Sequence, residues 1–253
     1  MSTSHMFEIL CEIEPPTTPD LGVVREQIAL LQGRCDAFLV PDSHLGRATV
    51  SSIAVAHEVA YLQGRAVACL NARDRNLLGL RRDLLTAHAY GVKELLLVYG
   101  DKPSVGERAP MNVRTMLDEV RQFAPDLRVG VAADVNKPFP NWKRAADFLC
   151  TQLSFDASAV AAWRQTTAYD GQVYAGVIAL ASDKMALRLA ERIPGFKIPG
   201  FLLDRLRNDP NAGVEAAVAT IGELKAAHVV DGVHLVPGRR YREVAAALDE
   251  VEV

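Results

Sequence analysis

The chain has 253 residues, of which 49% are hydrophobic and 23% are charged, values typical of a folded protein with a large buried core. This composition excludes an intrinsically disordered chain, a collagen-like repeat and a coiled-coil rod. The net charge of −3 argues against a nucleic-acid partner or an anionic membrane surface, and no apolar run reaches the roughly 20 residues that cross a bilayer.

The beginning of the sequence does not resemble a secretory leader, because no charged stretch followed by an apolar run opens it. The four cysteines are widely spaced and form no CxxC pair: they are Cys11, Cys35, Cys69 and Cys150. This spacing is typical of reduced core cysteines and not of a disulfide framework or a zinc site. We therefore expect a cytoplasmic protein without a bound metal.

Strands and helices alternate along the first half of the chain. Apolar runs predict strands at 7–13, 37–40, 66–70 and 94–99, and helical spacing predicts helices at 20–31, 49–62 and 77–89. Proline and glycine residues separate these segments, as Pro15 and Pro16 do after the first strand. The pattern is that of consecutive βα units.

The second half continues the same alternation. Strands are predicted at 129–133, 148–153, 173–178 and 233–236, and helices at 157–167, 184–192, 214–227 and from 242 onward. Eight strand–helix units in about 250 residues predict one (β/α)8 barrel, a TIM barrel, and no linker divides residues 1–253. A doubly wound open sheet is the rival architecture, but no strand-to-helix turn carries GxGxxG.

The active site of such a barrel lies at the carboxyl ends of its strands. Glu12 lies near the end of the first strand on the same side as Glu14, so at least one of these carboxylates is expected in the barrel mouth. Asp101 follows the fourth strand after Gly100, which permits a sharp turn. A solvated strand end or a simple Gly-Asp turn explains either acid when it is considered alone.

Further polar residues lie at or near the same rim. Gln152 interrupts the sixth strand, and a buried amide needs a partner, either inside the barrel or on a ligand. The loop 71–76 after the third strand is charged, although such loops are commonly only solvated. Arg240, after the eighth strand, is either a surface residue or a partner for a carboxylate.

Two residues leave their roles open. Glu58, in the second predicted helix, is either an exposed helix position or a second acid near the mouth. His234, in the eighth strand, is expected to be a hydrogen-bonded core histidine, since neither it nor His44 has the spacing of a metal site. The sequence contains no motif typical of a Ser-His-Asp triad, a P-loop or a zinc site.

Several strings occur in the order in which they occur in methylenetetrahydrofolate reductases. They are Glu12-Ile-Glu-Pro-Pro16, Pro41-Asp-Ser, Leu70-Asn-Ala-Arg-Asp-Arg-Asn76, Tyr99-Gly-Asp-Lys-Pro103, Thr151-Gln-Leu-Ser-Phe-Asp156 and Asp231-Gly-Val-His-Leu235. The sequence resembles this family over nearly its whole length. The resemblance implies a (β/α)8 barrel that reduces 5,10-methylenetetrahydrofolate to 5-methyltetrahydrofolate.

The resemblance also implies roles for individual residues. Glu12 would be the catalytic acid that protonates N10 of the folate, and Asp101 would stabilise the resulting 5-iminium cation. Gln152 would hold the pterin. The remaining expectations are Asp42 and Arg240 at the substrate, and Asn71, Tyr99 and Asp183 at the cofactor.

The departures from the family concern the flavin that most of its members bind. Cys69 stands in place of a histidine, Tyr99 in place of an arginine and Asp183 in place of a phenylalanine. The segment between Ala133 and Thr151 lacks the family's long helix and is about a dozen residues short. These losses resemble the flavin-independent branch found in mycobacteria, in which Glu58 has a counterpart as a catalytic residue.

We therefore expect direct hydride transfer from NADH, with FAD doubtful and no fingerprint that separates NADH from NADPH. A flavin-containing reductase, a pterin-binding methyltransferase with a corrinoid partner and a non-catalytic folate-binding subunit are the alternatives. Retention of Glu12, Asp101 and Gln152 argues against the last. The expected partner is a reduced folate, and the expected state is a monomer or small homo-oligomer.

Overall fold

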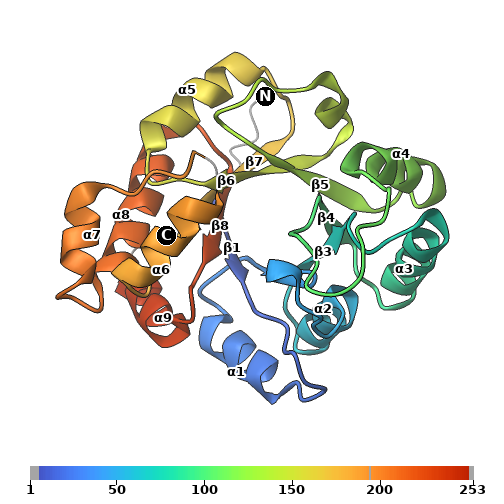
Figure 1. Cartoon of the computed structure of the whole chain (residues 1–253), viewed down its shortest axis with the longest axis horizontal. Helices are drawn as coiled ribbons and strands as arrows, with labels where there is room; N and C mark the ends of the chain where they lie inside the picture. Colours follow the sequence, from blue (N-terminus) through green and yellow to red (C-terminus); the bar gives the residue numbers. More distant parts are fainter. Residues whose placement is uncertain (1–5, 194, 251–253) are drawn as a thin grey trace.

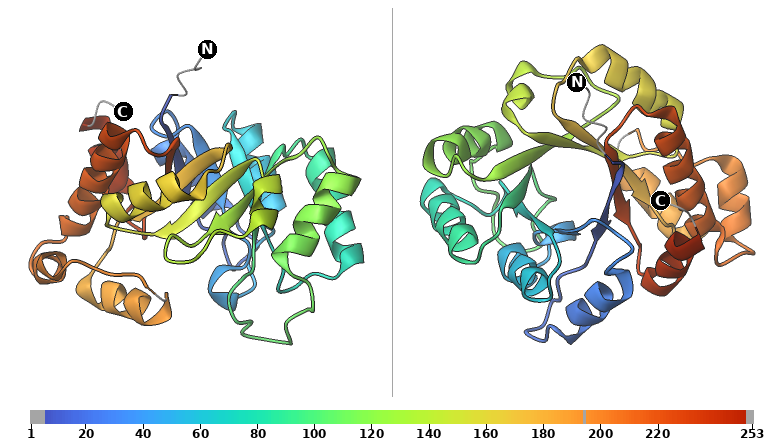
Figure 2. Two further views of the ribbon diagram at one scale, coloured as in Figure 1. Left: turned by 90° about the horizontal axis from the view of Figure 1, so that it is seen from above. Right: turned by 180° about the vertical axis from the view of Figure 1, so that it is seen from behind.

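Eight parallel strands form a closed barrel in which the order around the axis is the order along the chain, and β8 pairs with β1 (Figure 1). The computed structural model describes residues 6–193 and 195–250. Viewed along the axis, the helices surround the strands (Figure 2). The predicted (β/α)8 barrel is confirmed. Within the described residues, no helix has the length and apolar character needed to cross a membrane.

All eight predicted strands are present, and their ends agree with the prediction to within one residue. They are β1 (Glu8–Glu12), β2 (Ala37–Val40), β3 (Ala66–Asn71), β4 (Glu94–Val98), β5 (Arg128–Ala133), β6 (Phe148–Leu153), β7 (Gln172–Ile178) and β8 (Gly232–Val236). Buried parallel strands read as short apolar runs between turn residues, which is why the sequence pattern located them well.

The helices agree less closely with the prediction. They are α1 (Gly22–Leu31), α2 (Ser52–Tyr61), α3 (Leu77–Ala89), α4 (Val113–Phe123), α5 (Ala157–Thr167), α6 (Asp183–Arg192), α7 (Gly200–Leu206), α8 (Ala212–Ala227) and α9 (Tyr241–Glu250), with 3-10 turns η1 (His44–Gly46) and η2 (Asn141–Ala145). Neither α4 nor α7 is among the predicted helices. Helix α2 begins three residues later than predicted, because Ser51 is extended and the Val50 N–H donates to the Pro16 carbonyl.

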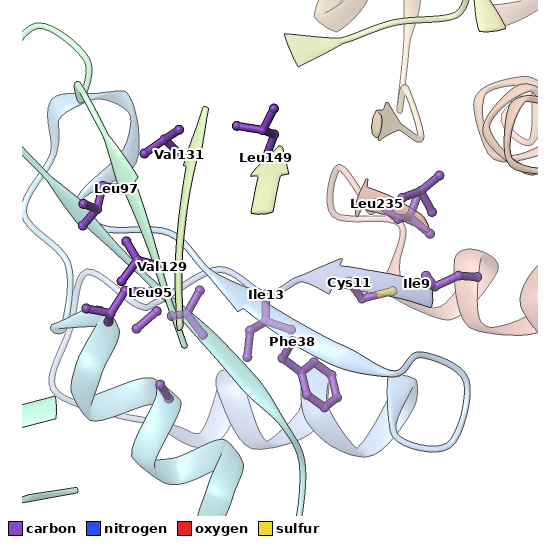
Figure 3. Packing of buried hydrophobic residues seen from close by; sticks show 14 of the residues in the cluster. Ile9, Cys11, Ile13, Phe38, Leu95, Leu97, Val129, Val131, Leu149 and Leu235 are labelled. Atoms are coloured by element: carbon purple, nitrogen blue, oxygen red, sulfur yellow. The ribbon is translucent and has the colours of Figure 1, made fainter. Parts of the chain in front are cut away.

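Two hydrophobic layers hold the strands and helices together. One layer consists of strand residues alone and therefore fills the barrel interior; its members are Leu10, Ala37, Leu39, Val67, Cys69, Leu96, Phe148, Cys150 and Tyr174. The other lies between strands and helices, where Leu95 and Leu97 of β4 lie beside Val129 and Val131 of β5 (Figure 3). Alternate residues of each strand thus face the interior or the helices.

The connection between β5 and β6 holds only the 3-10 turn η2 and irregular chain. Phe139, in the irregular part, packs against Trp163 of α5 and against Tyr169, with ring centroids 6.2 and 5.8 Å apart. This agrees with the short segment found in the sequence between Ala133 and Thr151. Aromatic packing takes the place of a helix on this side of the barrel.

Charged side chains close the amino end of the barrel interior. Arg65 donates to Glu8 at 2.6 Å and to Glu94 at 2.7 Å, and Arg128 also donates to Glu94. The Tyr174 hydroxyl donates to Glu8 at 2.5 Å. Burial by itself raises the pKa of Glu8, but the hydrogen bonds from Arg65 and Tyr174 outweigh it and bring that pKa below its ordinary value. These contacts occupy the amino end of the barrel interior, and the carboxyl end is where barrel enzymes bind their ligands.

Two glycines give a matched test of barrel closure. A methyl group on Gly232 of β8 would lie 2.1 Å from the Glu8 carbonyl oxygen of β1, whereas Gly222 of α8 faces open space. We expect Gly232→Ala to lower the free energy of unfolding by about 1–3 kcal/mol through overpacking. Gly222→Ala should raise it by about 0.4–1 kcal/mol. Urea denaturation measures both free energies of unfolding. Equal changes in the two variants would contradict close packing between β1 and β8.

Candidate active site

Glu12 ends β1 and faces the barrel interior, because it alternates with Leu10 of the interior layer. Its carboxyl oxygen Oε2 lies 3.1 Å from Nε2 of His234 on β8, and the two side chains are 17% and 13% exposed. Oε1 makes no hydrogen bond to any described residue. Glu12 is therefore a carboxyl group at the mouth with one oxygen held and the other available.

Asp101 lies in the loop after β4, at the same end of the barrel as Glu12. Gly100 has a φ of +81°, so the predicted sharp turn is present. The Asp101 carboxylate accepts a hydrogen bond from the Leu45 N–H of η1 at 2.7 Å, and the residue is exposed. Asp101 is thus fixed to the loop after β2, with no hydrogen bond to Glu12 or Gln152 among the described residues.

Two arginines hold the loop that carries Asp101. Arg108 donates to the carbonyls of Tyr99, Gly100 and Asp101 at 2.8–3.0 Å, and its guanidinium lies 3.9 Å from the centroid of the Tyr99 ring. Arg73 is buried, binds Asp74 at 2.6 Å and also donates to the Asp101 carbonyl. The charged loop 71–76 is therefore not simply solvated, and a buried arginine within it supports the rim.

Gln152 lies next to the end of β6, where the pairing with β7 shifts register between Cys150 and Leu153. A methyl group on Gly176 of β7 would lie 2.7 Å from the Thr151 carbonyl oxygen and 2.9 Å from that of Gln152, so this approach requires glycine. The Gln152 side chain is exposed and makes no hydrogen bond within the described part of the chain. Its amide is free to bind a ligand at the mouth.

Asp42 and Asn71 bind each other at the ends of β2 and β3. The Asp42 carboxylate accepts from the Asn71 backbone N–H at 2.9 Å, from its side-chain amide at 2.7 Å and from Arg75. Asn71 is fully buried, and its side-chain carbonyl accepts from the Asp74 N–H at 3.1 Å. The polar atoms of Asp42 and Asn71 thus form hydrogen bonds within the protein and hold the ends of β2 and β3 together.

Asp183 and Arg240 lie around the helices that follow β7 and β8. Asp183 is the first residue of α6, and its carboxylate accepts from the Lys184 N–H at 2.7 Å and lies 3.7 Å from Arg207. Arg240 donates to Asn211 at 2.9 Å and lies 3.2 Å from Glu243. Both side chains thus form ion pairs or hydrogen bonds within the protein, and the buried Nε of Arg240 makes no hydrogen bond to a described residue.

The structure places Glu58 on the outside of the barrel, which is one of the two positions that the sequence left open for it. Glu58 lies on α2 and accepts a hydrogen bond from Arg25 of α1 at 2.5 Å. The side of α2 that faces the strands consists of small and apolar residues such as Ile53 and Val55. The Glu58 carboxylate therefore lies between two outer helices, and its described partner is Arg25.

The thiols of the barrel interior carry no charge at neutral pH. Burial and the nearby Glu12 charge hold the pKa of Cys69 well above its usual range, and burial raises the pKa of Cys150 to about 12. Among the described residues, no group of three His, Cys, Asp or Glu side chains could hold a metal ion. The acid–base groups of the mouth are therefore Glu12, His234 and Asp101.

Two surface hollows lie on the outside of the barrel. One of about 340 Å³ lies between α7 and α8, and one of about 330 Å³ lies near the amino end of β8 and includes His228 and Asp231. Neither is lined by Glu12, Asp101 or Gln152. The polar groups at the strand ends remain the better candidate site, because they lie where barrel enzymes bind their ligands.

Solved structures with a similar fold cover nearly the whole chain. A protein from Clostridium thermocellum, described as uncharacterized and as binding two copies of 5-methyl-5,6,7,8-tetrahydrofolic acid, has a TM-score of 0.72 at 15% identity over 96% of this chain and 94% of that one. A β-glucuronidase from an uncultured Clostridium species gives 0.54 at 12% identity, over 91% of this chain and 43% of that one. The aldolase QR15 gives 0.53 at 10% identity, over 98% and 96%. At these identities the likeness shows the barrel fold alone.

No protein of curated function matches the sequence. The sequence model of methylenetetrahydrofolate reductase matches residues 26–251. Glu12 precedes the matched range, whereas Asp101, Gln152 and His234 lie within it. Because the match spans most of its length, this chain belongs to the methylenetetrahydrofolate reductase family.

Proposed function

We propose that this protein reduces 5,10-methylenetetrahydrofolate to 5-methyltetrahydrofolate, with hydride taken directly from NADH and without a bound flavin. The observation that carries the proposal is the Glu12 carboxyl group inside the mouth, held through one oxygen and available through the other. Family membership supports the reaction class. The folate bound by the Clostridium thermocellum protein is the product of this reaction, which supports a folate site on the same fold.

Glu12 acts as the general acid in this proposal. Its proton passes to N10 of the folate, the bond between N10 and the bridging carbon breaks, and a 5-iminium cation forms at N5. A carboxyl group at the end of a rigid strand can be positioned for such a transfer more accurately than one on a loop. After product release, the Glu12 carboxylate takes a proton from water and the cycle closes.

Asp101 and Gln152 act on the charge and the orientation of the pterin. The Asp101 carboxylate, fixed at the rim by the Leu45 N–H, supplies negative charge that favours the iminium cation. The exposed amide of Gln152 offers a donor and an acceptor for the edge of the pterin ring. Bound NADH supplies the hydride that converts the bridging carbon into the methyl group.

The residues near β3 and β4 fit a bound flavin poorly. A flavin dinucleotide carries an anionic pyrophosphate, which proteins commonly hold with free cations or with backbone N–H groups. Here Arg73 and Arg75 bind aspartates, and Arg108 binds three backbone carbonyls and the Tyr99 ring. The flavin-free form of the reaction is therefore the one that we propose.

The purified protein should be colourless and should oxidise NADH only when methylenetetrahydrofolate is present. The absorbance spectrum tests the first point, and anaerobic NADH oxidation at 340 nm tests the second, with 5-methyltetrahydrofolate identified as the product. A stoichiometric flavin band would contradict the flavin-free proposal. Methyl transfer without NADH oxidation would identify a methyltransferase instead.

Replacing Glu12 by glutamine removes the transferable proton and keeps the side-chain size. We expect Glu12→Gln to lower kcat about 10²- to 10⁴-fold, the usual contribution of a general acid, with folate binding largely retained. Steady-state kinetics and folate titration measure the two effects. Glu26→Gln, at an exposed glutamate of α1, serves as the control and should leave kcat unchanged. A Glu12→Gln variant with the wild-type kcat would remove Glu12 from this role.

A further inference from the structure

The imidazole of His234 contacts Glu12 across the junction of the first and last strands. Nε2 of His234 lies 3.1 Å from Oε2 of Glu12, and both side chains are more than four-fifths buried. The contact joins residues 222 positions apart in the sequence. It exists only because β8 closes the barrel onto β1.

The position of His234 follows from strand alternation. Val233 and Leu235 belong to the layer between strands and helices, so His234 between them faces the barrel interior. His234 is in register with Leu10 of β1 on one side and with Gly176 of β7 on the other. Gly176 has no side chain, and Glu12 lies one interior position beyond Leu10 toward the mouth.

A hydrogen atom on Nε2 suits both states of the acid. When Glu12 is protonated on Oε1, Oε2 is a carbonyl oxygen and accepts the His234 N–H. When the proton has passed to the substrate, Oε2 belongs to a carboxylate and accepts the same N–H in a stronger, charge-assisted bond. The ring thus fixes one oxygen and directs the other toward the mouth throughout the reaction.

We infer that His234 is a positioning residue for Glu12, which holds the carboxyl group by Oε2 and stabilises the carboxylate formed on proton transfer. This inference rests on the proposed function. In this proposal His234 acts through Glu12 and not on the folate itself. The proposed proton transfer is unchanged: the proton leaves Oε1 of Glu12 and arrives at N10.

The other titratable groups around the pair do not replace this contact. Cys69 faces Glu12 from β3, and its raised pKa keeps it a neutral thiol. Tyr241 of α9 feels the charges of Glu12 and Glu14, and burial raises the pKa of its hydroxyl, so it too is neutral. Glu14 lies 3.9 Å from Arg239. Leu39 of β2, in register with Glu12, is apolar.

The test compares His234→Leu, which removes the N–H donor, with His234→Gln, which keeps a donor on a side chain of similar reach. We expect His234→Leu to lower kcat about 10²-fold through a misplaced acid, while KM for the folate changes little. His234→Gln should recover most of kcat.

A double-variant cycle separates an effect through Glu12 from a general structural effect. In the Glu12→Gln background, adding His234→Leu should lower kcat no further. His88→Leu, at an exposed histidine of α3, is the control and should match the wild type. Circular dichroism and thermal unfolding verify that each variant is folded, and His234→Gln keeps the test valid if His234→Leu does not fold.

The outcomes distinguish this inference from the function on which it rests. If the wild type reduces the folate and His234→Leu has the wild-type kcat, the inference is overturned and the proposed function stands. The inference also fails if His234→Leu lowers kcat by the same factor in the wild type and in the Glu12→Gln background. It fails as well if the kcat of His234→Gln is as low as that of His234→Leu. A wild type that does not oxidise NADH with the folate overturns both.

Discussion

Closure of the sheet between β1 and β8 determines where the polar side chains of the mouth lie. The register of this junction sets Glu8 beside Gly232 and Leu10 beside His234, so that Glu12 reaches the His234 ring at the open end. The same register leaves room only for glycine at position 232. A shift of one residue would turn Glu12 toward the apolar layer under the helices, and the acid would be lost from the mouth.

An apolar layer inside the barrel separates the charged groups at its amino end from the polar groups at its carboxyl end. At the amino end, Arg65 and its carboxylate partners neutralise one another and fill the space. At the carboxyl end, Glu12 and Gln152 keep polar atoms that make no hydrogen bond within the described part of the chain, and Arg108 holds the loop that carries Asp101. Polar atoms without an internal partner, on rigid strand ends, can bind a ligand. The charged groups at the amino end bind one another and stabilise the fold.

Strand positions could be predicted from the sequence because buried parallel strands are short apolar runs, but side-chain partners could not. Asp42 and Asn71 looked like ligand-binding residues, and only the folded rim shows that they bind each other. His234 looked like an ordinary core histidine, since its partner is 222 residues away. The family resemblance placed Glu58 with the acids, although its side chain faces Arg25 on an outer helix. The partners of these side chains come from distant segments of the chain. A local sequence pattern therefore does not predict them.

The account depends on hydride passing from nicotinamide to the bridging carbon in one step at this mouth. The most direct measurement uses NADH carrying deuterium at both C4 positions, with mass spectrometry of the 5-methyltetrahydrofolate formed in ordinary water. Direct transfer predicts one deuterium in every methyl group, because the hydride never meets an exchangeable site. A methyl group without deuterium would contradict the account, since it would show that the hydride passed through a carrier, such as a reduced flavin, that exchanges with solvent.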